Sequence, residues 1–391
     1  MSESDLLVRA ERLLPEALAL LEEICAIDTG TGQQTGIGLV SELLGTNLNK
    51  LGFELEFVPA GEYGRHLKAS RAGTGNRLLI VGHLDTVYPQ GSARRPQSAD
   101  GRLSGPGVYD CKGGLLVAWT ACKLLAESGR SCPPLTILAN CDEEIGSLSS
   151  RPLIEAEAAR AAAVLVVEPA PAPQSVIVAR KGIGRYQLKV YGRSAHAGSD
   201  RESGVNALVE LAIKILALEE INTSAPGYTV TVGAATGGTR PNVIPDYAQA
   251  EIDLRITEAS QIEMAESAIA RAVAATRFVG ASYRLEGGIT RPPMPANEAN
   301  LGLFAVAREA AAALGMTLAA ASSGGGSDGN FCAALGVPVL DGMGPAGGGA
   351  HSDGEHIIPA SLATRAALLA AVICRLGARG LRGNRKSGIE A

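Results

Sequence analysis

Short apolar segments that lead into polar residues alternate with helical patterns in the first part of the chain. The apolar segments, each leading into a histidine or acids, predict buried strands at 77–85, 135–140 and 163–167. Leucine and alanine at helical spacing predict helices at 5–26 and 113–128, with Pro15 breaking or kinking the first. Strands that alternate with helices are typical of an α/β domain, in which functional residues gather at the carboxyl ends of strands.

The pattern changes near residue 180, where apolar and polar residues begin to alternate. This alternation predicts half-exposed antiparallel strands at 184–191, 228–236 and 243–256, with helices at 203–220 and 258–275. Antiparallel strands with two helices indicate a small α+β domain of about a hundred residues.

The α/β pattern returns after Arg291-Pro292-Pro293, with a helix at 298–314, a strand at 337–340 and a final helix at 360–376. We therefore predict an α/β domain formed by residues 1–180 and 289–391, interrupted by an α+β insert at 181–288. The last dozen residues are polar and contain glycine, which predicts a frayed terminus.

The composition is that of a globular protein, with 46% hydrophobic and 19% charged residues. A net charge of −5 gives no basic field to attract nucleic acid or an anionic membrane surface, and 4% aromatic residues leave little for base stacking. The first 30 residues carry scattered acids and lack an export signal, and no run of 18 apolar residues occurs. We therefore expect a cytoplasmic protein with no nucleic-acid or membrane partner.

The seven cysteines are odd in number and form no C-x-x-C pair. This spacing excludes a zinc knuckle and a thioredoxin-type motif, and it favours buried free thiols in a reducing compartment. Cys111 remains a conceivable nucleophile, although no histidine–asparagine pattern accompanies it.

Acids and histidines recur where strands end or the chain turns. They are His83, Asp85, Asp110, the run Asp142-Glu143-Glu144, Glu168 and His351. Carboxylates that gather at one sheet edge repel one another unless a cation lies between them, and imidazole with carboxylate ligands suits zinc or a similar divalent ion. A two-ion site needs a bridging carboxylate, one histidine and one further acid per ion, and a separate acid for the proton of water. The set supplies that number of groups.

Four motifs occur in a fixed order: Gly82-His83-Leu84-Asp85-Thr86, Asp110-x-Lys112-Gly113-Gly114, Asp142-Glu143-Glu144-x-Gly146 and His351-Ser352-Asp353. Together with Gly-Arg-Ser-Ala-His-Ala-Gly at 192–198, they resemble the metallopeptidase family of glutamate carboxypeptidases, aminoacylases and acetylornithine or succinyl-diaminopimelate deacylases. The resemblance covers nearly the whole chain and is greatest to the bacterial glutamate carboxypeptidase branch. It implies a zinc-peptidase-like mixed sheet with flanking helices and a ferredoxin-like dimerisation insert.

The resemblance also implies a role for each acid and histidine. Asp110 would bridge two zinc ions, for which cobalt or manganese could substitute. The remaining ligands would be His83 and Glu168 on one ion, and Glu144 and His351 on the other. Glu143 would be the general base that deprotonates the bridging water and then protonates the leaving amine. Asp85 would hydrogen-bond to His83 and orient it.

His196 lies in the insert on a glycine-flanked turn, where spacing alone favours a surface or core histidine. In the resembled family this histidine comes from the partner subunit's insert and stabilises the oxyanion of the tetrahedral intermediate. The resemblance therefore implies a homodimer.

Three residues match family positions that bind substrate. Asn242 and Arg255 correspond to residues that hold a substrate carboxylate, for which an arginine fork is suited. Arg291 matches a further arginine of the glutamate carboxypeptidase branch, with a surface arginine before two prolines as the alternative.

We therefore expect a metal-dependent hydrolase of an amide or peptide bond next to a free carboxylate. The substrate would be small or dipeptide-like, with a C-terminal glutamate-like residue. An N-acyl amino acid deacylase is the alternative that uses the same residues with a different pocket. A non-catalytic binding dimer and a cysteine hydrolase are two further alternatives.

Overall fold

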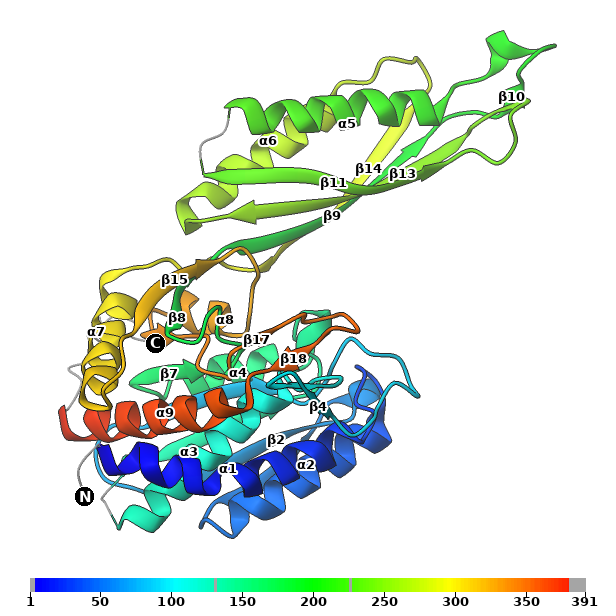
Figure 1. The fold of residues 1–391 in the computed structure, drawn as a ribbon. Helices are drawn as coiled ribbons and strands as arrows, with labels where there is room; N and C mark the ends of the chain where they lie inside the picture. Colours follow the sequence, from blue (N-terminus) through cyan, green and yellow to red (C-terminus); the bar gives the residue numbers. More distant parts are fainter. Residues whose placement is uncertain (1–3, 130–131, 225–226, 380–391) are drawn as a thin grey trace. The chain divides into compact units, whose positions relative to one another are not determined.

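The computed structural model describes residues 4–129, 132–224 and 227–379, so the predicted frayed terminus lies outside the described residues. The chain divides into two compact units (Figure 1). The first consists of Met1–Ala179, Ala296–Ser322 and Ser327–Ala391, and the second of Arg180–Pro295 and Ser323–Gly326. The second unit is therefore inserted into the sequence of the first.

A six-stranded mixed sheet forms the centre of the first unit. From one edge to the other its strands are β1 (Glu54–Pro59), β2 (Arg65–Arg71), β6 (Leu135–Asn140), β3 (Leu78–His83), β7 (Ala163–Val166) and β16 (Val339–Leu340). Strands β6, β3, β7 and β16 are parallel, whereas β2 runs antiparallel to both β1 and β6. Every residue of β3, β6 and β7 is buried, which explains their unbroken apolar runs. The three strands predicted in this region are confirmed.

Helices flank this sheet. They are α1 (Ser4–Cys25), α2 (Gln34–Asn49), α3 (Lys112–Ser128), α4 (Arg151–Ala158), α7 (Glu298–Ala313), α8 (Gly329–Ala334) and α9 (Pro359–Arg379). Helices α1, α3 and α9 pack against one another, and α2 packs on β2. Of the predicted break or kink at Pro15, the break is wrong, because α1 continues through this residue. Pro15 lies on the exposed face, where water can hydrogen-bond to the carbonyl that loses its helical partner.

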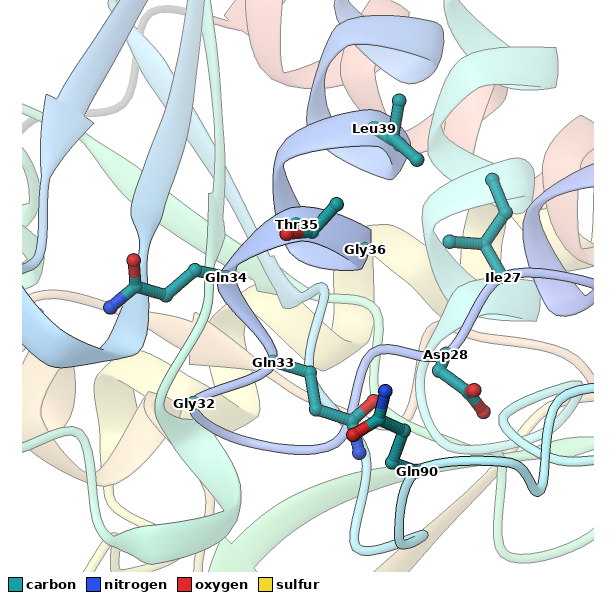
Figure 2. Close-up of a pocket in the computed structure, with 9 residues that line it drawn as sticks. All are labelled: Ile27, Asp28, Gly32, Gln33, Gln34, Thr35, Gly36, Leu39 and Gln90. Carbon is teal, nitrogen blue, oxygen red and sulfur yellow. The ribbon is translucent and has the colours of Figure 1, made fainter.

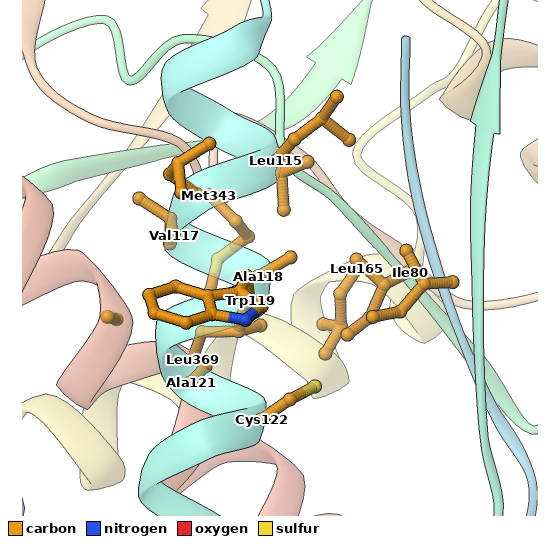
Figure 3. Close-up of a cluster of buried hydrophobic side chains, with 14 of the residues drawn as sticks. Ile80, Leu115, Val117, Ala118, Trp119, Ala121, Cys122, Leu165, Met343 and Leu369 are labelled. Carbon is orange, nitrogen blue, oxygen red and sulfur yellow. The ribbon is translucent and has the colours of Figure 1, made fainter. Parts of the chain in front are cut away.

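Buried apolar side chains pack on both sides of α3. Figure 3 shows Leu115 and Cys122 of α3 on the side of Ile80 and Leu165 of the sheet, whereas the single tryptophan, Trp119, lies on the side of Leu369 of α9. The apolar contacts toward the sheet fix α3 on it, and α3 begins at Lys112, two residues after Asp110.

Of the helices in the described part of the chain, α9 contains one stretch, Pro359–Ala378, that is long and apolar enough to cross a membrane. That stretch is 72% buried inside the protein, and α9 packs against α1, α3 and α7. These contacts are those of a core helix.

Two smaller sheets complete the first unit. One has the order β17 (Gly347–Gly348), β18 (His356–Ile357), β5 (Arg102–Ser104) and β4 (Gln97–Ala99), and the other pairs β15 (Ala319–Ser323) with β8 (Ser175–Arg180). The antiparallel pairing of β5 with β18 joins the chain just before Asp110 to the chain just after His351. Short 3-10 helices lie at Gly61–Tyr63 and, as η2, at Glu143–Ile145.

The second unit has a four-stranded antiparallel sheet with two helices on one face (Figure 1). Its elements are β9 (Gly182–Tyr191), α5 (Ala207–Ser224), β11 (Tyr228–Gly237), β13 (Tyr247–Ile256), α6 (Ile262–Ala274) and β14 (Ser282–Arg291). The spatial order β14-β9-β13-β11 with this βαββαβ sequence is the ferredoxin-like arrangement. A separate two-stranded ribbon pairs β10 (Ala195–His196) with β12 (Val243–Ile244).

The insert was predicted to end at residue 288, but the compact unit extends to Pro295. Strand β14 pairs with β9 from Ser282 to Arg291, with a register shift between Ile289 and Arg291, and Arg291 lies opposite Ile183. Because these ladder bonds hold residues 289–291 in the sheet, they belong with the insert.

Candidate metal centre

His83 ends the buried strand β3 at the carboxyl edge of the main sheet, and its side chain is 1% exposed. Its Nδ1 lies 2.9 Å from the backbone oxygen of Asp85 and 3.5 Å from the Asp85 carboxylate. A hydrogen bond to that carbonyl places the ring proton on Nδ1 and leaves the Nε2 lone pair for a metal ion. The backbone oxygen of Asp85 therefore lies closer to the His83 ring than the Asp85 carboxylate does.

The Asp85 carboxylate holds other groups. It accepts hydrogen bonds from the Thr31 hydroxyl at 2.7 Å and from the backbone N–H groups of Glu143 and Glu144, each at 3.2 Å. Because η2 begins at Glu143, these bonds fix the start of that turn and the direction of both acids. Sequence reasoning missed Thr31 and this second role of Asp85.

Asp110 lies in the turn just before α3, and steric limits require the glycines at the start of that helix. A Cβ on Gly113 would lie 2.1 Å from the Val108 oxygen, and a Cβ on Gly114 would lie 1.8 Å from the Val167 oxygen. Only glycine permits this approach of α3 to the end of β7. The buried Lys112 ammonium donates to the carbonyl oxygens of Ile24 and Ile27 at 3.1 and 3.0 Å, which ties the turn to the end of α1.

Gly114→Ala is expected to lower the free energy of unfolding by about 1–3 kcal/mol or more, because the new methyl group overlaps backbone rather than a flexible side chain. Denaturant unfolding measures the change. Gly302→Ala is the matched control, since that exposed position in α7 has open space around it and alanine favours helix there. A Gly114→Ala protein as stable as wild type would contradict the steric explanation.

The two carboxylate oxygens of Asp110 face two different groups of ligands. On one side, His83 Nε2 lies 3.0 Å from Asp110 Oδ1 and 3.4 Å from Glu168 Oε1. On the other side, His351 Nε2 lies 3.2 Å from both Asp110 Oδ2 and Glu144 Oε2. Each group brings ligand atoms within 4.8 Å of one another, which is close enough for one ion per group. Asp110 has the geometry of a bridging carboxylate.

The residues fit divalent cations. Glu144 Oε1 is buried and has no hydrogen-bond partner, which is costly for a carboxylate oxygen unless a cation neutralises it. Hydrogen bonds that His351 donates to Asp110 and Glu144 raise the pKa of His351 to about 10. Burial acts to raise the pKa of Asp110, but its contacts with His351 and His83 lower it overall. These acids therefore favour positive charge between them, and a metal ion supplies it in place of protons.

Cys111 belongs to the first group by position, since its sulfur lies within 4.8 Å of ligand atoms of His83, Asp110 and Glu168. The thiol donates to the Val167 oxygen at 3.3 Å, and burial raises its pKa to about 12. A buried, protonated thiol is a poor nucleophile, so the cysteine-hydrolase alternative finds no support in this geometry.

In the second unit, His196 lies on β10 beside the strand that follows Asn242, and both side chains are exposed. The backbone N–H groups of Gly198 and Ser199 donate to His196 Nδ1 at 3.2 and 3.1 Å. Because Nδ1 accepts these bonds, the proton of the neutral ring lies on Nε2. The ring therefore presents a hydrogen-bond donor, as an oxyanion requires.

The two predicted substrate-binding arginines lie in different surroundings. Arg255 donates from Nε and Nη2 to the Asp253 carboxylate at 2.7 and 3.1 Å, and from Nη1 to the Gly324 oxygen at 3.0 Å. Arg291 is 5% exposed at the end of β14, so it is buried rather than the surface arginine of the alternative.

A separate pocket of about 520 Å³ borders the segment 27–36 and Gln90 (Figure 2). Its lining residues do not include the acids and histidines of the two groups. The Asp28 carboxylate accepts hydrogen bonds from the N–H groups of Gly91 and Ala93 at 2.8 and 2.7 Å. This acid therefore anchors the loop after β3.

Comparison with known proteins identifies the family. Residues 79–375 match the model of peptidase family M20/M25/M40. The chain belongs to this family. The M20 chain is 33% identical over 376 residues to carboxypeptidase G2 of Pseudomonas sp. (strain RS-16). The alignment covers 93% of this chain and 90% of that protein. It is 28% identical to a succinyl-diaminopimelate desuccinylase of Alkalilimnicola ehrlichii, over 93% of this chain and 100% of that one.

A solved structure supports the M20 fold. The aminopeptidase PepT of Bacillus cereus ATCC 10987 superposes with a TM-score of 0.81 at 24% identity, covering 94% of this chain and 98% of that chain. The family match and these relatives show that the M20 protein is a metal-dependent peptidase or amidohydrolase. The alternative of a non-catalytic binding dimer therefore finds no support.

Proposed function

We propose that this protein is a two-zinc carboxypeptidase that removes a C-terminal glutamate-like residue by hydrolysing the amide bond next to its free carboxylate. The observation that carries the two-ion site is that the two carboxylate oxygens of Asp110 face different histidines. Its Oδ1 faces His83 and its Oδ2 faces His351. The carboxypeptidase assignment draws support from the likeness to carboxypeptidase G2 over nearly the full length of both chains.

His83 and Glu168 would hold one ion, Glu144 and His351 the other, and Asp110 both. Bound zinc supplies a lowered pKa for water and polarisation of the scissile carbonyl. Cobalt or manganese would serve as substitutes.

Glu143 takes the proton of the attacking water and passes it to the leaving nitrogen. Its side chain is half-buried, and the Asp85 carboxylate fixes its backbone. Placing a ligand and a proton carrier next to each other is chemically useful, because the metal neutralises Glu144 while Glu143 keeps a basic oxygen.

In the second unit, His196 Nε2–H stabilises the oxyanion in the active site of a partner subunit, so the working form is a homodimer. Asn242, Arg255 and Arg291 hold the substrate carboxylate. The bidentate contact of Arg255 with Asp253 keeps its guanidinium in a fixed orientation.

A substrate panel with controlled metal content tests the proposal. Dialysis against a chelator is expected to abolish turnover and to lower the melting temperature, and zinc, cobalt or manganese is expected to restore both. The metal-loaded protein should cleave folate-type and N-acylglutamate substrates faster than acetylated amino acids. The opposite preference would favour the N-acyl amino acid deacylase, which the likeness to a succinyl-diaminopimelate desuccinylase keeps as the second candidate. Failure to cleave either class in the loaded form would refute both.

His196→Ala is expected to lower kcat by about a hundredfold or more, as for a lost oxyanion donor, with unchanged metal content. Mixing it with a Glu143→Ala protein tests the exchange between subunits. One site of each mixed dimer then combines an intact Glu143 with the partner subunit's His196. Subunit exchange should therefore recover about a quarter of the wild-type rate, since half the dimers are mixed and half their sites are intact. If His196 serves its own subunit, mixing recovers nothing.

A further inference from the structure

Glu355 is a buried acid close to the metal centre, and its carboxylate accepts hydrogen bonds from four donors. The side chain is 1% exposed. Its Oε1 accepts from the backbone N–H groups of Tyr109 and Asp110 at 2.9 and 3.0 Å. Its Oε2 accepts from the Tyr88 hydroxyl at 2.5 Å and from the Gly107 N–H at 3.2 Å. Four donors occupy both oxygens, so this carboxylate is used inside the protein rather than on a metal ion.

These contacts join three loops that each carry a metal-binding candidate. Tyr88 follows β3 and thus His83, Gly107–Asp110 precede α3, and Glu355 ends the turn that contains His351. The Tyr88 hydroxyl also lies 2.8 Å from the Ser352 oxygen, and the Glu355 N–H donates to that same oxygen at 3.1 Å. His351 has a left-handed backbone, with φ of 63°. Such a turn keeps its shape only when its surroundings hold it.

We propose that Glu355 is a positioning residue that sets the separation of Asp110 and His351, and thereby the affinity of the ion shared by Asp110, Glu144 and His351. This inference rests on the two-ion function proposed above. The Glu355 carboxylate accepts from the backbone N–H of the bridging acid, and Glu355 directly precedes β18, the strand that anchors the His351 turn. It thereby fixes the 3.2 Å approach of His351 Nε2 to Asp110 Oδ2. Pre-organised ligands of this kind bind metal more tightly than ligands that must be ordered first.

Glu355→Gln tests the inference, because it replaces one carboxylate oxygen with an NH₂ group. Donors face both oxygens of Glu355, so the NH₂ group meets donors in either orientation and cannot accept from them. Metal-free protein is titrated with Co²⁺ alone and followed by its visible spectrum and by competition with a chelator. Affinity for one of the two ions is expected to fall by about 10–100-fold, with a changed spectrum for that ion. Excess Co²⁺ should restore kcat with KM unchanged, since Glu355 does not touch substrate.

Two variants keep the result interpretable. Glu157→Gln removes another buried acid, which pairs with Lys68 and Arg77 away from the metal-binding candidates, and is expected to lower stability without changing Co²⁺ binding. Tyr88→Phe removes only the hydroxyl and is expected to weaken one ion severalfold, so it decides the matter if Glu355→Gln does not fold.

The outcomes separate the two proposals. A wild-type protein that binds fewer than two Co²⁺ ions overturns both the two-ion function and the role of Glu355. A wild-type protein that binds two ions, with Glu355→Gln or Tyr88→Phe binding them equally tightly and with the same spectrum, overturns the role of Glu355 alone.

Discussion

The Glu143→Gln variant is expected to keep its full metal content and to turn over substrate about 10²–10⁴-fold more slowly than wild type. Glutamine keeps the size of the side chain and the backbone N–H that donates to Asp85 Oδ1 at 3.2 Å. It cannot take the proton of water at neutral pH, so only the proton transfer is removed. Steady-state kinetics and elemental analysis of the same preparation measure both quantities.

Glu144→Gln is the matched control, because it changes the adjacent acid of the same turn. Glu144 Oε2 lies 3.2 Å from His351 Nε2 and its Oε1 is buried without a partner, so this acid should be needed for the ion. Metal content and activity should therefore both fall in Glu144→Gln, whereas in Glu143→Gln only activity should fall. A fully metallated and active Glu143→Gln protein would show that another group carries the proton.

The parts of the fold that were predicted correctly have strong local patterns. Strands β3 and β6 are buried on both faces, so they occur as apolar runs that no surface segment imitates. Helix α2 was missed because its buried face includes glycine and serine, which weaken the helical signal. Strand β14 was missed because much of it is partly exposed and it contains Gly287 and Gly288. Its omission also placed the end of the insert too early.

In the candidate site, too, residues in local motifs could be predicted, whereas a residue that depends on tertiary contacts could not. His83, Asp110 and Glu144 lie in short motifs whose glycines and acids have local reasons, and the structure brings these residues together. Glu355 carries no such signal, because its role depends on backbone N–H groups from a loop more than two hundred residues away in sequence. The spacing of four residues after His351 was the only available hint, and it has meaning only once β18 pairs with β5. Tertiary hydrogen bonds of this kind cannot be read from periodicity.

The Asp110→Asn variant is expected to lose both ions, from about two per chain to fewer than one, because the amide replaces a shared charge with a donor on one side. Activity should fall by about 10³-fold or more, which corresponds to several kcal/mol of lost metal stabilisation of the transition state. Elemental analysis and kinetics on the same sample measure both losses.

Asp100→Asn is the matched control for this substitution. Asp100 is exposed on the turn between β4 and β5 with φ of 50°, a left-handed backbone that asparagine tolerates well, so metal and activity should remain. Chelation should lower the melting temperature of wild type and of Asp100→Asn but not that of Asp110→Asn, which has no bound ions to lose. If Asp110→Asn instead loses one ion and keeps the other at wild-type affinity, the two ions do not share Asp110. The separate contacts of its two oxygens would then describe one metal ligand and one hydrogen bond.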